Sequence, residues 1–250
     1  MGSSSGSRLS LFSLVFYVRF VFTTVMYCLF IGIPGIMAMP FVSSAVRGKI
    51  WRNLIRFYGR TAIRISGYPF IKVKYYDLAP DEKSAGVVVA NHRSGADAFM
   101  YGIWPLDLVQ IAGEWPFKLP FFGLFAKYGG YYNIRKIEFA DFIRQASDDI
   151  LKNNVSVVGF PEGTRSVSCE MGPFHGTLFR LAIEVKCPVY PFLMLGTETV
   201  VNRQFKVSPG IINLYKLPAV KPKEFENWTP FQLKSYVRNY MAAKIVELEK

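Results

Sequence analysis

Hydrophobic residues are concentrated at the beginning of the chain, where charge is almost absent. Between residues 9 and 41 only Arg19 is charged, and the part after Arg19 is long enough to cross a hydrocarbon core of roughly 30 Å. Gly32, Pro34 and Gly35 lie inside this run and would kink or break a helix there. The pattern therefore predicts membrane contact, and it leaves open a spanning helix or a helical hairpin inserted into one leaflet.

The next segment, residues 46–67, repeats arginine every fourth position, which aligns the arginines along one helical face. The arginines are Arg52, Arg56, Arg60 and Arg64. Because acidic partners are absent from this part of the sequence, we predict an interfacial helix whose basic side chains contact lipid phosphates. A solvated charged face is the alternative.

After residue 67 the pattern changes to short apolar runs that alternate with helical stretches. We predict strands at residues 71–76, 86–90, 108–112, 131–135, 155–160 and 189–195. Helices are predicted at residues 96–103, 117–128, 139–153, 177–185 and 230–248. Alternation of this kind indicates an α/β fold, with helices packed on a sheet. We therefore divide the chain into a tail and two-helix membrane anchor, residues 1–67, and one α/β domain, residues 68–250.

The net charge of +12 is located mainly at the beginning of the chain, since ten basic residues and no acidic residue precede Asp77. Such a segment could bind nucleic acid, but this one adjoins the long apolar run, so an anionic membrane surface is the favoured partner and nucleic acid is not. Basic residues on this side of the run also predict that the following domain is cytoplasmic.

Histidine and cysteine are too few and too scattered to form a metal site or a disulfide framework. The histidines are His92 and His175, and the cysteines are Cys28, Cys169 and Cys187. We therefore predict neither a zinc cluster nor a set of disulfides, and the cysteine usage agrees with a reducing compartment.

A first polar cluster follows the predicted strand 86–90 and contains His92 and Asp97. A strand-to-helix turn can bring the imidazole and the carboxylate into contact, with Gly95 permitting a tight backbone. Asp97 would accept one imidazole N–H, and the other ring nitrogen of His92 would act as a general base. A histidine that only caps the next helix is the alternative, which spacing alone does not exclude.

A second polar cluster follows the predicted strand 155–160. It places a carboxylate, a glycine, a hydroxyl and a guanidinium in one turn, as Glu162, Gly163, Thr164 and Arg165. Ligands of α/β folds bind beyond the carboxyl ends of strands, where both clusters lie. Arg165 is suited to a bidentate phosphate contact, with Glu162 orienting the phosphate or the polar group that carries it. A plain loop with an internal glutamate–arginine pair is the alternative.

Together the two clusters resemble the glycerophospholipid acyltransferase family, and within it the bacterial-type lysophosphatidic acid acyltransferases. Members carry N-H-x4-D and, roughly 65 to 75 residues on, F-P-E-G-T-R. Here these motifs are residues 91–97 and 160–165, and the resemblance covers about residues 68–195 together with the N-terminal helices. Residues 130–135 look like a further block that supplies a basic residue, here Arg135, to the acceptor phosphate. Residues 187–191 are similar to the block that lines the acyl side of the site.

The resemblance implies a mixed α/β sheet flanked by helices, an N-terminal membrane-embedded helical segment and O-acyltransferase activity in phospholipid biosynthesis. His92 would deprotonate the free hydroxyl of lysophosphatidic acid, which attacks an acyl thioester of acyl carrier protein or coenzyme A and gives phosphatidic acid. The residues carried over are His92 and Asp97 for catalysis, and Arg135, Glu162, Gly163, Thr164 and Arg165 for substrate binding. Apart from the thioester co-substrate, the resemblance implies no cofactor and no metal.

Three alternatives stay open. Many members have a lysine where His175 stands, which weakens the assignment to lysophosphatidic acid and leaves room for another lysolipid acceptor, including a lyso-amino-acid lipid. A non-enzymatic lipid-binding protein on the same fold is disfavoured by the intact His92 and Asp97. A lipid hydrolase would need an activated nucleophile, and Ser94 and Cys169 have no credible base in the sequence.

Overall fold

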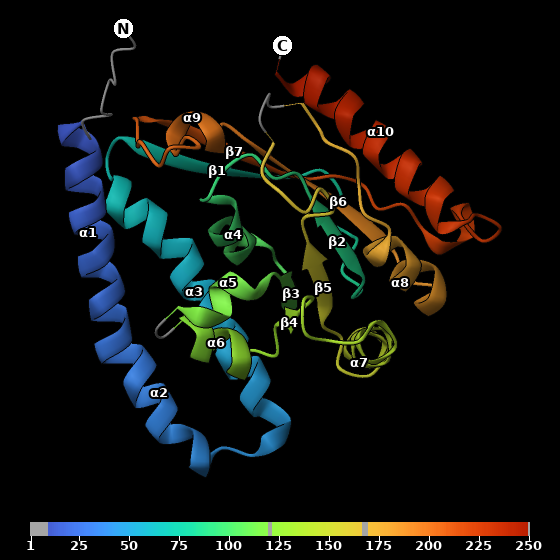
Figure 1. Ribbon diagram of the computed structural model, residues 1–250, viewed down its shortest axis with the longest axis horizontal. Helices are drawn as coiled ribbons and strands as arrows, with labels where there is room; N and C mark the ends of the chain where they lie inside the picture. Colours follow the sequence, from blue (N-terminus) through green and yellow to red (C-terminus); the bar gives the residue numbers. More distant parts are fainter. Residues whose placement is uncertain (1–9, 120–121, 167–169, 250) are drawn as a thin grey trace, which may run out of the picture.

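A mixed sheet forms the centre of the protein in a computed structural model, which describes residues 10–119, 122–166 and 170–249 (Figure 1). Its strands in this part of the chain are β1 (Ile71–Asp77), β2 (Val87–Ala90), β3 (Leu108–Ala112), β4 (Tyr132–Asn133), β5 (Ser156–Gly159), β6 (Val189–Leu195) and β7 (Gly210–Lys216). The strand order is β1-β7-β6-β2-β5-β3-β4. Strands β6, β2, β5, β3 and β4 run parallel, whereas β7 is antiparallel to β6 and pairs in parallel with β1. Five strands therefore end at the same edge.

Helices cover both faces of this sheet, as predicted (Figure 1). One face packs against α7 (Phe139–Leu151), α8 (Thr177–Val185) and α10 (Pro230–Leu248) in a core that includes Val87, Val157 and Leu193. On the opposite face, Val88, Val158 and Phe192 pack with residues from the N-terminal helices and from α4 (Asp97–Met100). This alternation follows from strand geometry, because successive side chains point to opposite faces. The polar turns lie at the carboxyl ends of the strands, between the two layers of helices.

The N-terminal segment is a helical hairpin that runs beside the sheet domain. It comprises α1 (Leu11–Tyr27), a π-helical turn (Cys28–Gly32), α2 (Ile33–Ala38) and a 3₁₀ turn (Met39–Phe41), after which α3 (Ser44–Gly67) returns alongside α1 (Figure 1). The π-helical turn ends two residues before Pro34, which has no backbone N–H to donate within the helix.

Residues 11–41 form a helix long and apolar enough to cross a membrane, and only 17% of its most apolar window is buried in the protein. Its exposed side chains include Leu11, Leu14, Val18, Phe22, Phe30 and Phe41. Exposed apolar side chains along a helix of this length are consistent with membrane association.

Two members of the arginine stripe of α3, Arg52 and Arg56, are partly buried against the sheet domain, so the prediction that these side chains contact lipid phosphates is wrong for these two. Arg52 binds both carboxylate oxygens of Asp107, each at 2.8 Å. Arg56 and Arg60 donate to the carbonyl oxygens of Trp104 and Gly102. Arg60 and Arg64 are exposed, whereas Arg52 and Arg56 are partly buried. The sequence pattern identified the helical face, but the partners lie too far along the chain for the pattern to reveal them.

Glycine makes this packing possible where α3 crosses the 3₁₀ turn Tyr101–Ile103. A Cβ on Gly59 would lie 2.7 Å from the carbonyl oxygen of Phe99, and a Cβ on Gly102 would lie 2.7 Å from that of Arg56. The backbones therefore approach closely only because both side chains are absent. This contact holds α3 against the element that begins with Asp97.

All six predicted strands are present, but β7 was missed and one predicted helix is divided. The predicted helix 117–128 is two helices, α5 (Glu114–Lys118) and α6 (Phe122–Tyr128). Strand β7 ends in Lys216, whose side chain is buried and binds Asp77 together with the carbonyl oxygens of Ala79 and Glu82. A buried lysine interrupts the apolar pattern from which a strand is predicted.

Candidate active site

The turn after β2 is anchored to the neighbouring strand through Asn91. Its side chain donates to the carbonyl oxygen of Met194 at 2.9 Å and accepts from the Met194 amide at 2.8 Å. Asn91 is 1% exposed, so this pairing satisfies a buried amide side chain with backbone groups of β6. The turn therefore leaves the sheet from a fixed position.

The turn brings His92 and Asp97 into contact, as predicted. Nδ1 of His92 lies 2.9 Å from Oδ2 of Asp97, and the same oxygen accepts the backbone N–H groups of Arg93 and Ser94 at 2.7 Å. The Asp97 side chain is fully buried, whereas that of His92 is 19% exposed. The imidazole stacks on Phe160 with 4.0 Å between ring centroids. Asp97 and Phe160 thus fix the ring orientation and leave Nε2 as the nitrogen available to a ligand.

The second polar turn, after β5, holds the backbone of His92 on both sides. Oε1 of Glu162 accepts the His92 N–H at 2.8 Å, and the Ser166 N–H donates to the His92 carbonyl oxygen at 2.7 Å. Oε2 of Glu162 accepts the Gly172 N–H at 2.9 Å. Both oxygens of this buried carboxylate are therefore occupied by backbone donors, and the two sequence motifs form one structure.

Gly163 and Thr164 form the exposed tip of the second turn. Gly163 has φ +72°, a left-handed conformation that favours glycine, and a Cβ there would lie 2.9 Å from the His175 ring. His175 thus packs over the tip, while its own N–H binds the Pro161 carbonyl oxygen at 2.7 Å. The tip presents exposed backbone beside a histidine.

Arg165 lies against the first turn. A Cβ on Gly95 would be 3.7 Å from its Nη1, and its guanidinium carbon is 5.1 Å from the centre of the Phe205 ring. Nη1 is buried and has no hydrogen-bond partner within the described residues. A buried guanidinium donor without a partner is costly, so this group is suited to an anion that arrives with the substrate.

Arg135 is not brought into this cluster by any contact among the described residues. It is exposed and follows β4, the outermost strand, whose end lies at the same sheet edge as those of β2 and β5. Among the described residues, only its backbone N–H has a hydrogen-bond partner, Oδ1 of Asn133 at 3.1 Å. Because β2, β5, β3 and β4 run parallel, their carboxyl ends lie at one edge of the sheet. Arg135 follows β4 and therefore lies at the same edge as the two polar turns.

An apolar cavity of about 350 Å³ extends from this edge between the N-terminal helices and α5 and α6. Gly95, Val201 and Phe205 line it next to the first turn, and Leu119, Phe122 and Phe125 line it farther away. Leu119, Phe122 and Phe125 all belong to the segment predicted as one helix, residues 117–128; Pro120 and Phe121 lie outside the described residues. Phe16, Tyr17 and Phe20 of α1 form the facing wall, which no pattern in the sequence indicated.

Comparison with known proteins agrees with this geometry. The Acyltransferase family profile matches residues 70–195, which include both polar turns. The chain belongs to this family. It is 30% identical to the 1-acyl-sn-glycerol-3-phosphate acyltransferase of Saccharomyces cerevisiae over 66% of this chain and 57% of that protein. Identity to the enzyme of that name from Limnanthes douglasii is 27%, over 83% of this chain and 72% of the relative.

The acyltransferase fold extends beyond the matched residues. The crystal structure of the 1-acyl-sn-glycerophosphate acyltransferase of Thermotoga maritima superposes with a TM-score of 0.77 and 24% identity, covering 95% of this chain and 96% of that one. The helical hairpin and the C-terminal helix are therefore part of a shared architecture.

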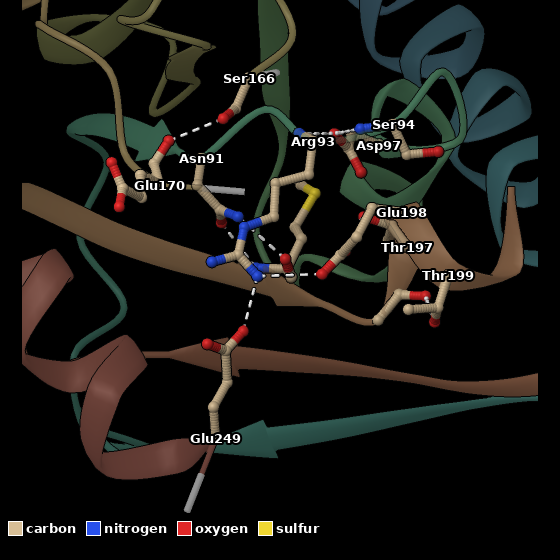
Figure 2. A network of polar contacts seen from close by, with 12 residues as sticks. Asn91, Arg93, Ser94, Asp97, Ser166, Glu170, Thr197, Glu198, Thr199 and Glu249 are labelled. Carbon is tan, nitrogen blue, oxygen red and sulfur yellow. Dashed lines mark hydrogen bonds and ion pairs between the residues drawn. The ribbon is translucent and has the colours of Figure 1, made fainter. Parts of the chain in front are cut away.

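Arg93 connects the first polar turn to the C-terminal helix. Figure 2 shows the Arg93 side chain running away from Asp97 towards Glu198 of α9 (Thr197–Val200) and Glu249, which follows α10; the N–O distances are 3.0 and 2.6 Å. The Arg93 side chain is only 5% exposed. Sequence analysis missed this residue, although an arginine between the motif histidine and aspartate was visible.

A cysteine nucleophile of the hydrolase type finds no support at Cys187. Burial raises the pKa of this thiol to about 12, and burial also separates it from solvent. Because the thiolate is the nucleophile, we expect Cys187 to resist a charged alkylating agent at pH 8 in the folded protein and to react after unfolding. Mass spectrometry of the alkylated peptides checks this, and rapid labelling in the folded state would contradict it. Cys169 lies outside the described residues.

Proposed function

We propose that this acyltransferase moves a fatty acyl chain from a thioester of acyl carrier protein or coenzyme A to the free hydroxyl of lysophosphatidic acid, which gives phosphatidic acid. The observation that carries the proposal is one arrangement at the end of an apolar cavity: His92 is paired with buried Asp97 and lies beside Arg165, whose buried Nη1 has no hydrogen-bond partner among the described residues. The names of the yeast and Limnanthes relatives support the same acceptor.

In the proposed reaction, Nε2 of His92 removes the proton from the acceptor hydroxyl as its oxygen attacks the thioester carbonyl. The carbon–sulfur bond then breaks, and the leaving thiolate takes the proton back from the imidazolium. Asp97 keeps Nδ1 protonated, so that Nε2 is the basic nitrogen. General-base catalysis of this kind contributes about 10² to 10⁴ in rate, and the remainder comes from positioning and from charge stabilisation.

The acceptor phosphate is proposed to bind Arg165, with Arg135 approaching from the outer strand and the exposed backbone of Gly163 and Thr164 nearby. Glu162 serves this site by holding two turns together, since both of its oxygens are bonded to backbone N–H groups. The acyl chain is proposed to occupy the apolar cavity. An extended lipid thus meets charged groups at one end and hydrocarbon walls along the rest.

We propose that the hairpin lies in the membrane with the sheet domain on the cytoplasmic side. The basic residues that follow the apolar run include Arg47 and Lys49, which support this orientation by the positive-inside rule. The division of the chain at residue 67 stays a prediction. Contacts cross this boundary, since Ser13 binds the backbone of Val207 and Arg52 binds Asp107. Part of the hairpin thus packs as a wall of the active site.

The test is thiol release from long-chain acyl-coenzyme A and from acyl carrier protein by the detergent-solubilised protein, with and without lysophosphatidic acid. Release that requires lysophosphatidic acid, with phosphatidic acid as product, supports the proposal. Release only with another lysolipid would move the acceptor, and release without any acceptor would indicate a hydrolase. Failure with every donor and acceptor would favour a lipid-binding protein.

Substitution of Arg165 by alanine tests the phosphate contact. We expect the KM for lysophosphatidic acid to rise about 10- to 100-fold, as for loss of a charge-assisted hydrogen bond. Turnover of monoacylglycerol, which has no phosphate, should change little. Arg144→Ala, at an exposed arginine of α7, is the matched control. An equal loss with both acceptors would contradict the assigned role.

A further inference from the structure

The loop of residues 202–206, between α9 and β7, is held in a strained conformation at the edge of the site. Phe205 has φ +61°, which is costly for a bulky side chain. Oδ1 of Asn202 accepts the N–H groups of Gln204 and Lys206 at 3.0 and 2.9 Å, and the Asn202 carbonyl oxygen accepts the Phe205 N–H at 2.9 Å. The surrounding hydrogen bonds thus force Phe205 into this position.

The N-terminal helix also holds this loop. The Tyr17 hydroxyl donates to the Phe205 carbonyl oxygen at 2.6 Å. Fully buried Ser13 donates to the Val207 carbonyl oxygen at 3.1 Å and accepts the Val207 N–H at 2.9 Å. Helix α1 therefore anchors the backbone that carries the Phe205 ring.

The ring lies between three parts of the site. Its edge is 3.0 Å from the position of a Cβ on Gly95, its face is 5.1 Å from the Arg165 guanidinium, and it lines the apolar cavity. About half of it, 51%, is exposed. A guanidinium stacked on an aromatic face still has the N–H groups at its edge free for an anion. Phe205 thus orients Arg165 without consuming its donors.

We propose that Phe205 determines acceptor specificity by holding Arg165 towards the phosphate of the acceptor and by closing the rim of the acyl cavity. This inference rests on the proposed function. Phe205 lies outside residues 70–195, the part matched by the family profile. The loop selects an acceptor with an anionic group next to a hydrocarbon chain.

Substitutions at Phe205 distinguish the contribution of its aromatic ring from that of its backbone conformation. Phe205→Leu keeps an apolar side chain but removes the aromatic face, and we expect its KM for lysophosphatidic acid to rise about 3- to 30-fold. Phe205→Tyr should restore a KM near that of the wild type. Phe205→Gly removes the ring but suits a positive φ, so we expect a raised KM together with a Tm no lower than that of the wild type.

The matched control is Phe139→Leu, because Phe139 stacks with Arg180 at 4.6 Å on the far layer and both side chains are exposed. Phe139→Leu should leave the KM for lysophosphatidic acid and the KM for the acyl donor unchanged. In Phe205→Leu the turnover of monoacylglycerol should fall much less than that of lysophosphatidic acid, because monoacylglycerol has no phosphate for Arg165 to bind. Wild-type kinetics in Phe205→Leu, or an equal loss with both acceptors, would overturn this inference. If the wild-type protein itself does not use lysophosphatidic acid, the proposed function fails instead.

Discussion

Replacing His92 by alanine is expected to abolish acyl transfer, with kcat lowered by about 10³-fold or more, because it removes the proposed proton acceptor and leaves Asp97 without its imidazole partner. The fold should persist, since the backbone of His92 keeps its bonds to Glu162 and Ser166. Thiol release and phosphatidic acid formation at saturating substrate measure the loss. Sedimentation with membranes should be unchanged.

His175→Ala is the control for this variant, because it removes the one other histidine and this histidine is exposed. We expect a much smaller loss in kcat than for His92→Ala. Asp97→Asn should fall between the two, since an amide can hold the wrong tautomer of the ring. Near-normal turnover of the His92 variant would refute the proposed base.

The contacts that the sequence predicted well are local. His92 and Asp97 lie within one turn, and Glu162 and Arg165 lie within another, so spacing and turn geometry were sufficient to place them. The edge at which both turns meet followed from the apolar strands before them. Local patterns thus predicted most of the α/β fold and the two halves of the site.

The contacts that the sequence did not reveal join distant segments. Glu162 was expected near the ligand, but it binds the backbone of His92 from the other motif, 70 positions away. Arg165 meets Phe205 from a loop with no recognisable motif, and Arg93 reaches Glu249 after the last helix. One sequence carries no information on such pairs beyond residue type, and a lone phenylalanine is usually part of a core.

The arginines of α3 also have partners in distant segments that the sequence did not reveal, and for Arg52 this contact has a measurable effect on stability. Arg52→Ala is expected to lower the free energy of unfolding by about 3 kcal/mol, because it leaves the carboxylate of Asp107 nearly buried without its partner. The two side chains are only 12% and 17% exposed, and both nitrogen–oxygen contacts are 2.8 Å. In a protein of this size the change corresponds to a decrease in Tm of roughly 6–12 °C.

Thermal unfolding in detergent measures this decrease, with Arg64→Ala as the matched control because Arg64 is exposed on the same helix. The control should change stability by less than about 0.5 kcal/mol. In the double variant with Asp107→Ala, the loss should be smaller than the sum of the single losses, since the two residues form one pair. Binding of folded Arg52→Ala to anionic vesicles should match that of the wild type. An unchanged Tm together with weaker, salt-sensitive vesicle binding would instead place Arg52 at the lipid surface, as the sequence alone indicated.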